Sequence, residues 1–245
     1  MLLSITPRSR ELITQPSNLS QNNNALNSSI SPLQTRTRPP HSTDLALYAA
    51  FFDSALPYLA ARGSAAQWGT LRMAERPGFE KRAEEWGERY MEAREKGGLW
   101  AMITESEIDW DVNLRKGELG ELRYPVDGDS GRRFLVVAAA VVREGWFPGY
   151  VEVGLGEYVR EAREKGEWVY LEILVSDFRT GEWRRGGGAA LVERVRAEAV
   201  GRGLRGFYVD CWAGNKGVLI RFYEDQGFKL LGTFSAKKSD TETWD

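Results

Sequence analysis

The sequence predicts an α/β fold, in which helices flank a mixed sheet, and three features indicate it. Residues 168–200 follow the pattern of a buried strand, a polar loop, a triple glycine and a helix. Residues 207–212 form the next apolar strand, and a strand that follows such a helix is expected to pair in parallel with the strand at 170–175. Two segments with helical spacing, 44–62 and 77–96, come earlier and supply covering helices.

The segment at 168–200 changes its apolar period where the helix is expected. Residues 170–175 are mostly large apolar or β-branched side chains, as an interior strand requires. Beyond the glycines the apolar residues share one helical face, namely Leu191, Val192, Val195 and Ala199. Gly201 and Gly203 then predict the end of that helix.

The remaining elements follow from the same signals. The first helix should be kinked or split at Pro57, and Pro77 should open the second one. We expect strands at 99–103, 134–142 and 228–234, helices at 157–165 and 216–226, a long surface loop at 105–132, a turn-rich connection at 145–156 and a polar tail at 235–245.

Composition limits the classes of function. Hydrophobic residues make up 42% and charged residues 28% of the chain, which is typical of a globular protein, and the net charge of −2 does not suggest a nucleic acid or an anionic membrane as partner. One cysteine, Cys211, excludes an internal disulfide, and with one histidine, His41, it argues against a metal cage or a histidine-based triad. We therefore expect no metal, no membrane span and a cytoplasmic location.

The first 42 residues are rich in Ser, Asn, Gln, Thr and Pro, so they are expected to be a disordered leader, with one folded domain at 43–245. Four arginines stand against a single acid, Glu11, in this leader, and a mitochondrial presequence is the alternative interpretation.

The turn before the helix predicts an anion site. Its residues are Trp183, Arg184, Arg185, Gly186, Gly187, Gly188 and Ala189. Glycine allows a ligand to approach the backbone, and the first amides of a helix have no intrahelical partner, so they attract phosphate together with the helix dipole. The two arginines add forked positive donors.

A second motif lies at 210–228, DCWAGNKGVLIRFYEDQGF, and ends in Phe-Tyr-Glu-Asp-Gln-Gly-Phe. With the glycine turn before it, separated by one helix and one strand, residues 168–234 resemble the GCN5-related N-acetyltransferase (GNAT) superfamily. The resemblance implies a largely antiparallel central sheet with one splayed parallel strand pair, and binding of acetyl-CoA. The N-terminal half fits this family only in the order of its elements.

The resemblance fits the glycine turn in two registers. Arg184-x-x-Gly187-x-Ala189 satisfies the family's literal Arg/Gln-x-x-Gly-x-Gly/Ala pattern. Alignment of the apolar helix start makes Gly186 and Gly188 the motif glycines instead, with Trp183 at the Arg/Gln position. Both registers leave the cradle of backbone amides in place.

The resemblance implies direct attack of an amine on the acetyl thioester within a ternary complex. Backbone groups near Leu174 and Val175 would bind the pantetheine arm and the thioester oxygen, and Asn215 resembles a coenzyme-contacting residue. Arg179, Arg184 and Arg185 are candidate phosphate contacts. The acceptor is expected to be a small-molecule or peptide amine.

Three residues are candidates for the chemistry. Tyr223 would protonate the coenzyme thiolate, although a buried tyrosine with a structural hydrogen bond is the alternative. Glu172 is the first candidate for the general base, because burial in an apolar strand is unfavourable for a charged carboxylate unless it has a role there. The alternative is that its side chain faces solvent or pairs with an arginine. Asp210 is the second candidate base, and a base acting through water is the third. Cys211 is interpreted as a small apolar strand residue rather than a nucleophile.

Two rival functions stay open at this point. The fold could serve as a coenzyme-binding or interaction module without catalysis. The glycine turn could also belong to another phosphate-binding α/β protein, although no Gly-Lys-Ser/Thr follows the glycines as it would in a P-loop.

Overall fold

A computed structural model describes residues 1–5, 35–38, 45–96, 98–108, 132–237 and 243–244 of the chain. Its central feature is a seven-stranded sheet in the order β2-β3-β4-β5-β6-β1-β7. The strands are β1 Leu2–Ile5, β2 Thr35–Arg38, β3 Leu99–Ile108, β4 Arg133–Glu144, β5 Trp168–Ser176, β6 Gly206–Asp210 and β7 Lys229–Gly232. Only β5 and β6 pair in parallel, so the mixed, largely antiparallel sheet that we expected is confirmed.

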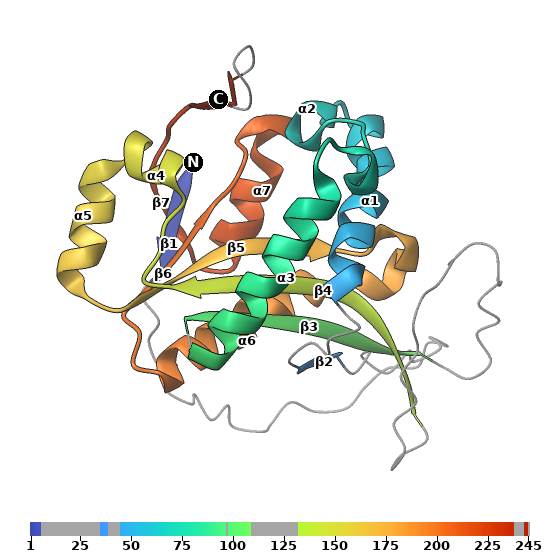
Figure 1. Cartoon of the computed structure of the whole chain (residues 1–245), viewed down its shortest axis with the longest axis horizontal. Helices are drawn as coiled ribbons and strands as arrows, with labels where there is room; N and C mark the ends of the chain where they lie inside the picture. Colours follow the sequence, from blue (N-terminus) through green and yellow to red (C-terminus); the bar gives the residue numbers. More distant parts are fainter. Residues whose placement is uncertain (6–34, 39–44, 97, 109–131, 238–242, 245) are drawn as a thin grey trace, which may run out of the picture.

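Helices cover both faces of this sheet (Figure 1). Their bounds are α1 Leu45–Ala61, α2 Ala65–Trp68, α3 Phe79–Lys96, α4 Gly149–Gly154, α5 Gly156–Lys165, α6 Gly187–Gly201 and α7 Gly214–Asp225, with 3-10 turns η2 at Met73–Glu75 and η3 at Phe178–Arg184. The apolar side chains of α6 and α7 pack on one face, which we call face A. Those of α1 and α3 pack on the opposite face, face B, over β3, β4 and β5, and α4 and α5 cover face B near β6 and β1.

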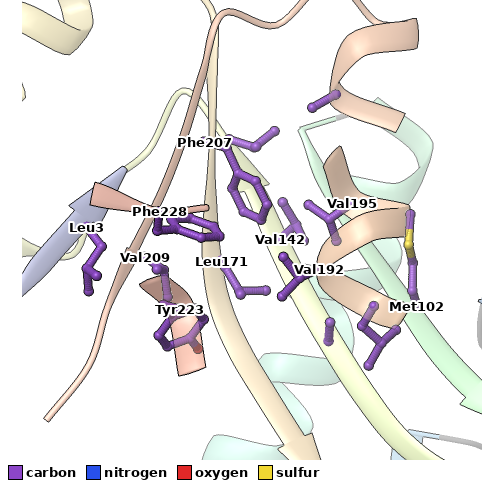
Figure 2. Packing of buried hydrophobic residues seen from close by; sticks show 14 of the residues in the cluster. Leu3, Met102, Val142, Leu171, Val192, Val195, Phe207, Val209, Tyr223 and Phe228 are labelled. Carbon is purple, nitrogen blue, oxygen red and sulfur yellow. The ribbon is translucent and has the colours of Figure 1, made fainter. Parts of the chain in front are cut away.

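The core on face A contains the strands and helices that the sequence motifs predicted. Figure 2 shows Val192 and Val195 of α6 near Val142, and Tyr223 of α7 beside Val209. Val192 and Val195 are almost fully buried, as the 3.6-residue spacing required. Burial of this stripe positions the first turn of α6 against the sheet.

The parallel pair separates partway along its length. Pairing runs from Trp168 opposite Gly206 to Leu171 opposite Val209, while β5 continues to Ser176. Val142 of β4 faces Leu171 but Val141 faces Ile173, so Glu172 is the extra residue of a β-bulge. A bulge bends its strand, and it lies at the position where β5 leaves β6. The splayed strand pair is therefore confirmed.

Both described stretches of the predicted leader, residues 2–5 and 35–38, pair with strands of the sheet. Leu2–Ile5 forms a strand between β6 and β7, and Thr35–Arg38 pairs with β3 at the edge of the sheet. Composition concealed β1, because its burial of Leu2 and Leu3 depends on distant strands. Residues 6–34 and 39–44 lie outside the described residues. Removal of residues 1–42 would take β1 and β2 out of the sheet.

Smaller differences concern lengths and two short helices that were not predicted, α2 and α4. Pro57 lies inside α1 without splitting it, β3 extends to Ile108, and the turn-rich connection contains α4. The loop after β5 forms η3, and the tail contains two short paired strands, β8 Ala236–Lys237 and β9 Thr243–Trp244. Residues 109–131 of the predicted surface loop lie outside the described part of the chain.

Leu3→Ala tests whether β1 belongs to the sheet. Leu3 has no exposed surface and packs in the face A core, so truncation should lower the free energy of unfolding by about 2–5 kcal/mol. Urea denaturation of the full chain measures this loss. Leu71→Ala is the control, because Leu71 is 54% exposed and should change stability by less than about 0.5 kcal/mol. Equal effects of the two substitutions would show that β1 does not fold into the sheet.

Candidate active site at the fork of the sheet

The separation of β5 from β6 produces a fork with backbone groups that no strand covers. Beyond Leu171 and Val209 no parallel pairing continues, so no described strand pairs with the β5 backbone from Glu172 to Ser176 on its β6 side. Leu174 points to face A and Val175 to face B. An extended ligand chain that contains amide groups could bind along this edge with backbone hydrogen bonds, as an added strand would.

The first turn of α6 presents free amides. Gly186 caps the helix in the left-handed conformation, with φ of 80°, which glycine adopts without strain. The first intrahelical bond is donated by the Ala190 amide to the Gly186 carbonyl, at 2.9 Å. The amides of Gly187, Gly188 and Ala189 precede that bond, so they are available to an anion at the positive end of the helix dipole.

Gly187 and Gly188 face different parts of the structure. A Cβ atom at Gly187 would lie 3.2 Å from Val137 Cγ2 and 3.3 Å from Ala138 Cβ, so glycine lets the helix begin directly on the sheet. A Cβ atom at Gly188 would lie 3.5 Å from Phe222 Cζ and 3.9 Å from Leu174 Cδ2. Gly188 therefore faces the space between α7 and the free part of β5.

Two buried hydroxyl groups of β3 hold this turn in place. Ser106 Oγ donates to the Trp183 carbonyl at 2.8 Å, and Thr104 Oγ1 donates to the Gly187 carbonyl at 3.3 Å. Both β3 residues are buried. The segment is thus fixed at each end, and these two contacts could not be predicted from the sequence because they join residues far apart in the chain.

The side chains beside the glycines have separate environments. Trp183 packs against Ile108, Leu135 and Val137, so its ring is part of the core. Arg184 stacks on the Phe178 ring, with Cζ 4.2 Å from the centroid, and its buried Nε has no hydrogen-bond partner in the described structure. Arg185 is exposed and pairs with Glu182 at 3.0 Å. Among the candidate arginines, Arg184 has the unsatisfied donor.

Arg179 is already used within the protein. Its guanidinium makes two bonds to the buried carboxylate of Asp177, at 2.8 and 2.7 Å. Asp177 also caps η3 by accepting from the Arg179 amide. The structure therefore gives Arg179 a structural partner.

Tyr223 lies on face A at the fork. It is 6% exposed and packs edge-to-face on Phe222 and Phe228, with ring centroids 5.1 and 5.5 Å away. Burial, with smaller contributions from the charges of Cys211 and Asp210, raises the pKa of its phenol well above 10. No hydrogen bond of the hydroxyl is found among the described residues, and the raised pKa keeps the phenol protonated at neutral pH.

Asn215 lies in an unusual backbone segment where α7 begins. Asn215, Lys216 and Gly217 all have positive φ, at 51°, 54° and 71°. Glycine and asparagine tolerate this conformation but lysine does not, and such strain clusters at functional sites. Arg221 Nη1 stabilises the segment by donating to the Lys216 carbonyl at 2.6 Å.

Asp210 lies at the fork with its carboxylate on face B. It accepts hydrogen bonds from the hydroxyl groups of Tyr170 and Tyr150, the latter at 3.4 Å. Burial raises the pKa of Asp210, and the Tyr170 hydrogen bond opposes this rise. The α-amino group of Met1, which donates to the Cys211 carbonyl at 3.2 Å, also contributes positive charge that lowers this pKa.

Tyr150 and Tyr170 were missed by the sequence reasoning. Tyr170 follows Trp168 by two positions on β5, so alternation places both on face B and could have indicated its direction. Tyr150 lies on α4, a helix that the sequence did not predict. Its contact with Asp210 required the fold.

Glu172 has a cation as its partner. Arg143 Nε lies 2.7 Å from Glu172 Oε2, and both side chains are about one-fifth exposed. The same guanidinium stacks over Trp146 at 4.3 Å. The structure thus supports the arginine-paired alternative for Glu172, although the bulge keeps this carboxylate beside the fork.

The described residues contain no cluster of three or more His, Cys, Asp or Glu side chains suited to a metal. In the same part of the chain, no helix combines the length and apolar character needed to cross a bilayer.

Alkylation of Cys211 tests the environment at the end of β6. Burial raises the pKa of this thiol to about 12, so little thiolate exists at neutral pH. Iodoacetamide at pH 8 should modify the native protein much more slowly than the protein in urea, as measured by intact mass. Equally rapid labelling in both states would contradict the burial of Cys211 and would favour the interpretation of Cys211 as a nucleophile.

A search of solved structures finds acetyltransferases that are similar to this chain. No family model matches the sequence, and no curated protein matches it either. A GCN5-related N-acetyltransferase from Ralstonia eutropha JMP134 aligns over 83% of this chain and 98% of its own, with 14% identity and a TM-score of 0.46. Glucosamine-6-phosphate N-acetyltransferase from Arabidopsis thaliana aligns over 84% and 99%, with 17% identity and a TM-score of 0.42.

A third solved structure, AAC(6')-Iy in complex with the bisubstrate analogue CoA-S-monomethyl-acetylneamine, aligns over 84% of this chain and 99% of its own, with 15% identity and a TM-score of 0.45.

Proposed function

We propose that the protein is an acetyl-CoA-dependent N-acetyltransferase that acts by direct attack within a ternary complex. The observation that carries this proposal is the fork between β5 and β6, with the free amides of Gly187, Gly188 and Ala189 at its mouth. A helix start binds a diphosphate, and an open strand edge binds the amide-rich pantetheine arm. Few ligands other than a coenzyme A thioester combine these two parts.

The residues at the mouth fit such a substrate. The left-handed cap at Gly186 and the exposure of Gly188 toward Leu174 and Phe222 favour the register in which these two are the motif glycines. Trp183 belongs to the core, so we assign the cationic contact to Arg184, whose Nε lacks a partner. Arg185 is a weaker candidate because it is exposed and paired with Glu182. Leu174, Val175 and Asn215 would contact the arm.

The chemistry requires proton transfer on both sides of the thioester. The amine nitrogen attacks the carbonyl carbon, the bond from carbon to sulfur breaks, and the excess proton leaves the nitrogen for a carboxylate. The departing thiolate takes a proton from Tyr223, which burial keeps protonated on face A. Backbone amides of β5 beside the oxygen would stabilise its developing charge.

We place Asp210 ahead of Glu172 as the general base. Glu172 is neutralised by Arg143, whereas Asp210 is bonded to two phenols and has a pKa raised by burial. A raised pKa makes the ionised carboxylate a stronger base toward the proton of the acceptor nitrogen. Glu172 would then help to orient Arg143 beside the fork.

Ligand binding tests the coenzyme site. Acetyl-CoA should raise the melting temperature of the protein, while ATP and NAD at equal concentration should not, because binding to the native state stabilises it. Arg184→Gln should weaken acetyl-CoA binding about tenfold to a hundredfold, since hydrogen bonds to charged groups contribute about 1.5–3 kcal/mol. Arg185→Gln is the matched control and should change the affinity much less. Identical shifts with ATP would point to a general nucleotide binder.

Tyr223→Phe tests the general acid. Turnover should fall about 10²-fold or more, while the dissociation constant of acetyl-CoA stays nearly the same, because only the transition state uses the proton. Steady-state kinetics and calorimetry measure the two quantities. Unchanged turnover would leave Tyr223 a structural role, and a protein that binds acetyl-CoA but acetylates no amine would be a coenzyme-binding module.

A further inference from the structure

An aromatic cluster lies on face B, where Tyr150 and Tyr170 donate hydrogen bonds to Asp210. Phe147 lies at the centre of this group, within 5.2–5.5 Å of the ring centroids of Trp168, Tyr170 and Tyr208. We call the rings of this cluster the aromatic wall, and its members are Trp146, Phe147, Tyr150, Trp168, Tyr170, Tyr208 and Phe234.

The wall is closed at its base and open at one side. Tyr170 is 1% exposed, whereas Tyr150 is 44% exposed and stacks on the partly buried Phe234 with centroids 6.0 Å apart. Tyr150 also donates to Asp210. Solvent therefore reaches the surroundings of this carboxylate past two aromatic rings.

The charges around Asp210 favour a cation. Within the described structure no lysine or arginine side chain is bonded to this carboxylate, and the nearby Arg143 is held by Glu172. The two phenol hydrogen bonds leave acceptor positions on the carboxylate, which has about four lone-pair sites. The one ammonium in its field is the α-amino group of Met1, which is bonded to the Cys211 carbonyl.

We propose that Asp210, Tyr150 and Tyr170 form the binding site for the acceptor ammonium, and that the acceptor is an amine attached to an uncharged aromatic or alkyl group. This inference rests on the proposed acetyltransferase function and names its substrate class. The ammonium binds to the carboxylate, and the apolar body lies on Tyr150 and Phe234. Aromatic faces attract cations and exclude hydrated anions, so a phosphate or carboxylate near the amine would lose contacts here.

Acceptor kinetics at saturating acetyl-CoA test this inference. The probes are 2-phenylethylamine, n-hexylamine and glucosamine 6-phosphate. We expect kcat/KM for the two apolar amines to exceed that for the sugar phosphate by at least about tenfold, since one unfavourable polar burial costs about that factor or more.

Variants separate recognition from folding. Tyr150→Ala should raise KM for 2-phenylethylamine about threefold to thirtyfold, in line with the size of cation–π contacts, with little change in the acetyl-CoA dissociation constant. Tyr150→Phe keeps the ring and should recover most of that loss. Val153→Ala on the same helix is the control, because Val153 is 90% exposed, and it should leave KM unchanged.

The outcomes distinguish this inference from the proposed function. Binding of acetyl-CoA with preferential acetylation of glucosamine 6-phosphate, or equal effects of Tyr150→Ala and Val153→Ala on KM, would overturn the assigned acceptor class and leave the coenzyme site standing. Absence of acetyl-CoA binding would overturn the proposed function, and the acceptor site would fall with it.

Discussion

The separation of β5 from β6 is the constraint on which the rest of the structure depends. Parallel strands normally bury each other's backbone groups, but here the bulge at Glu172 bends β5 immediately after its last pair with β6. The strand still pairs with β4 as far as Ser176, so it cannot collapse back to close the gap. The opening is therefore fixed by hydrogen bonds on the far side of β5 rather than by the groups that line it.

The opposite arm of the fork is held by β1. Leu2 lies opposite Asp210 on β6 and opposite Gly232 on β7, and the Cys211 amide donates to the Met1 carbonyl at 3.1 Å. Two fully buried leucines fix this strand between its neighbours. A segment that composition assigned to a leader thus orients the carboxylate of Asp210, which is why local sequence reasoning failed at this point. Strand pairing across two hundred residues leaves no local pattern.

Sequence reasoning succeeded where the signal was local. The stripe Leu191, Val192 and Val195 predicted α6, and the apolar strands on either side predicted the parallel pair. It failed where a contact joins distant segments, as for Tyr150 with Asp210, or where one residue changes direction without a change of type, as at the Glu172 bulge. Alternation along β5 would place Glu172 and Leu174 on the same face, whereas the bulge sends Leu174 to face A with Leu171.

The two faces of the fork carry different titratable groups, a phenol on face A and a carboxylate on face B. On face A, burial and the nearby charges of Cys211 and Asp210 raise the pKa of the Tyr223 phenol, so the phenol stays protonated. On face B, the Asp210 carboxylate is stabilised by two phenol donors, and burial raises its pKa at the same time. The Tyr223 phenol and the Asp210 carboxylate therefore lie on opposite faces of the sheet, one on each side of the fork. A thioester lying between the parted strands would meet the base on the side of the amine and the acid on the side of the sulfur.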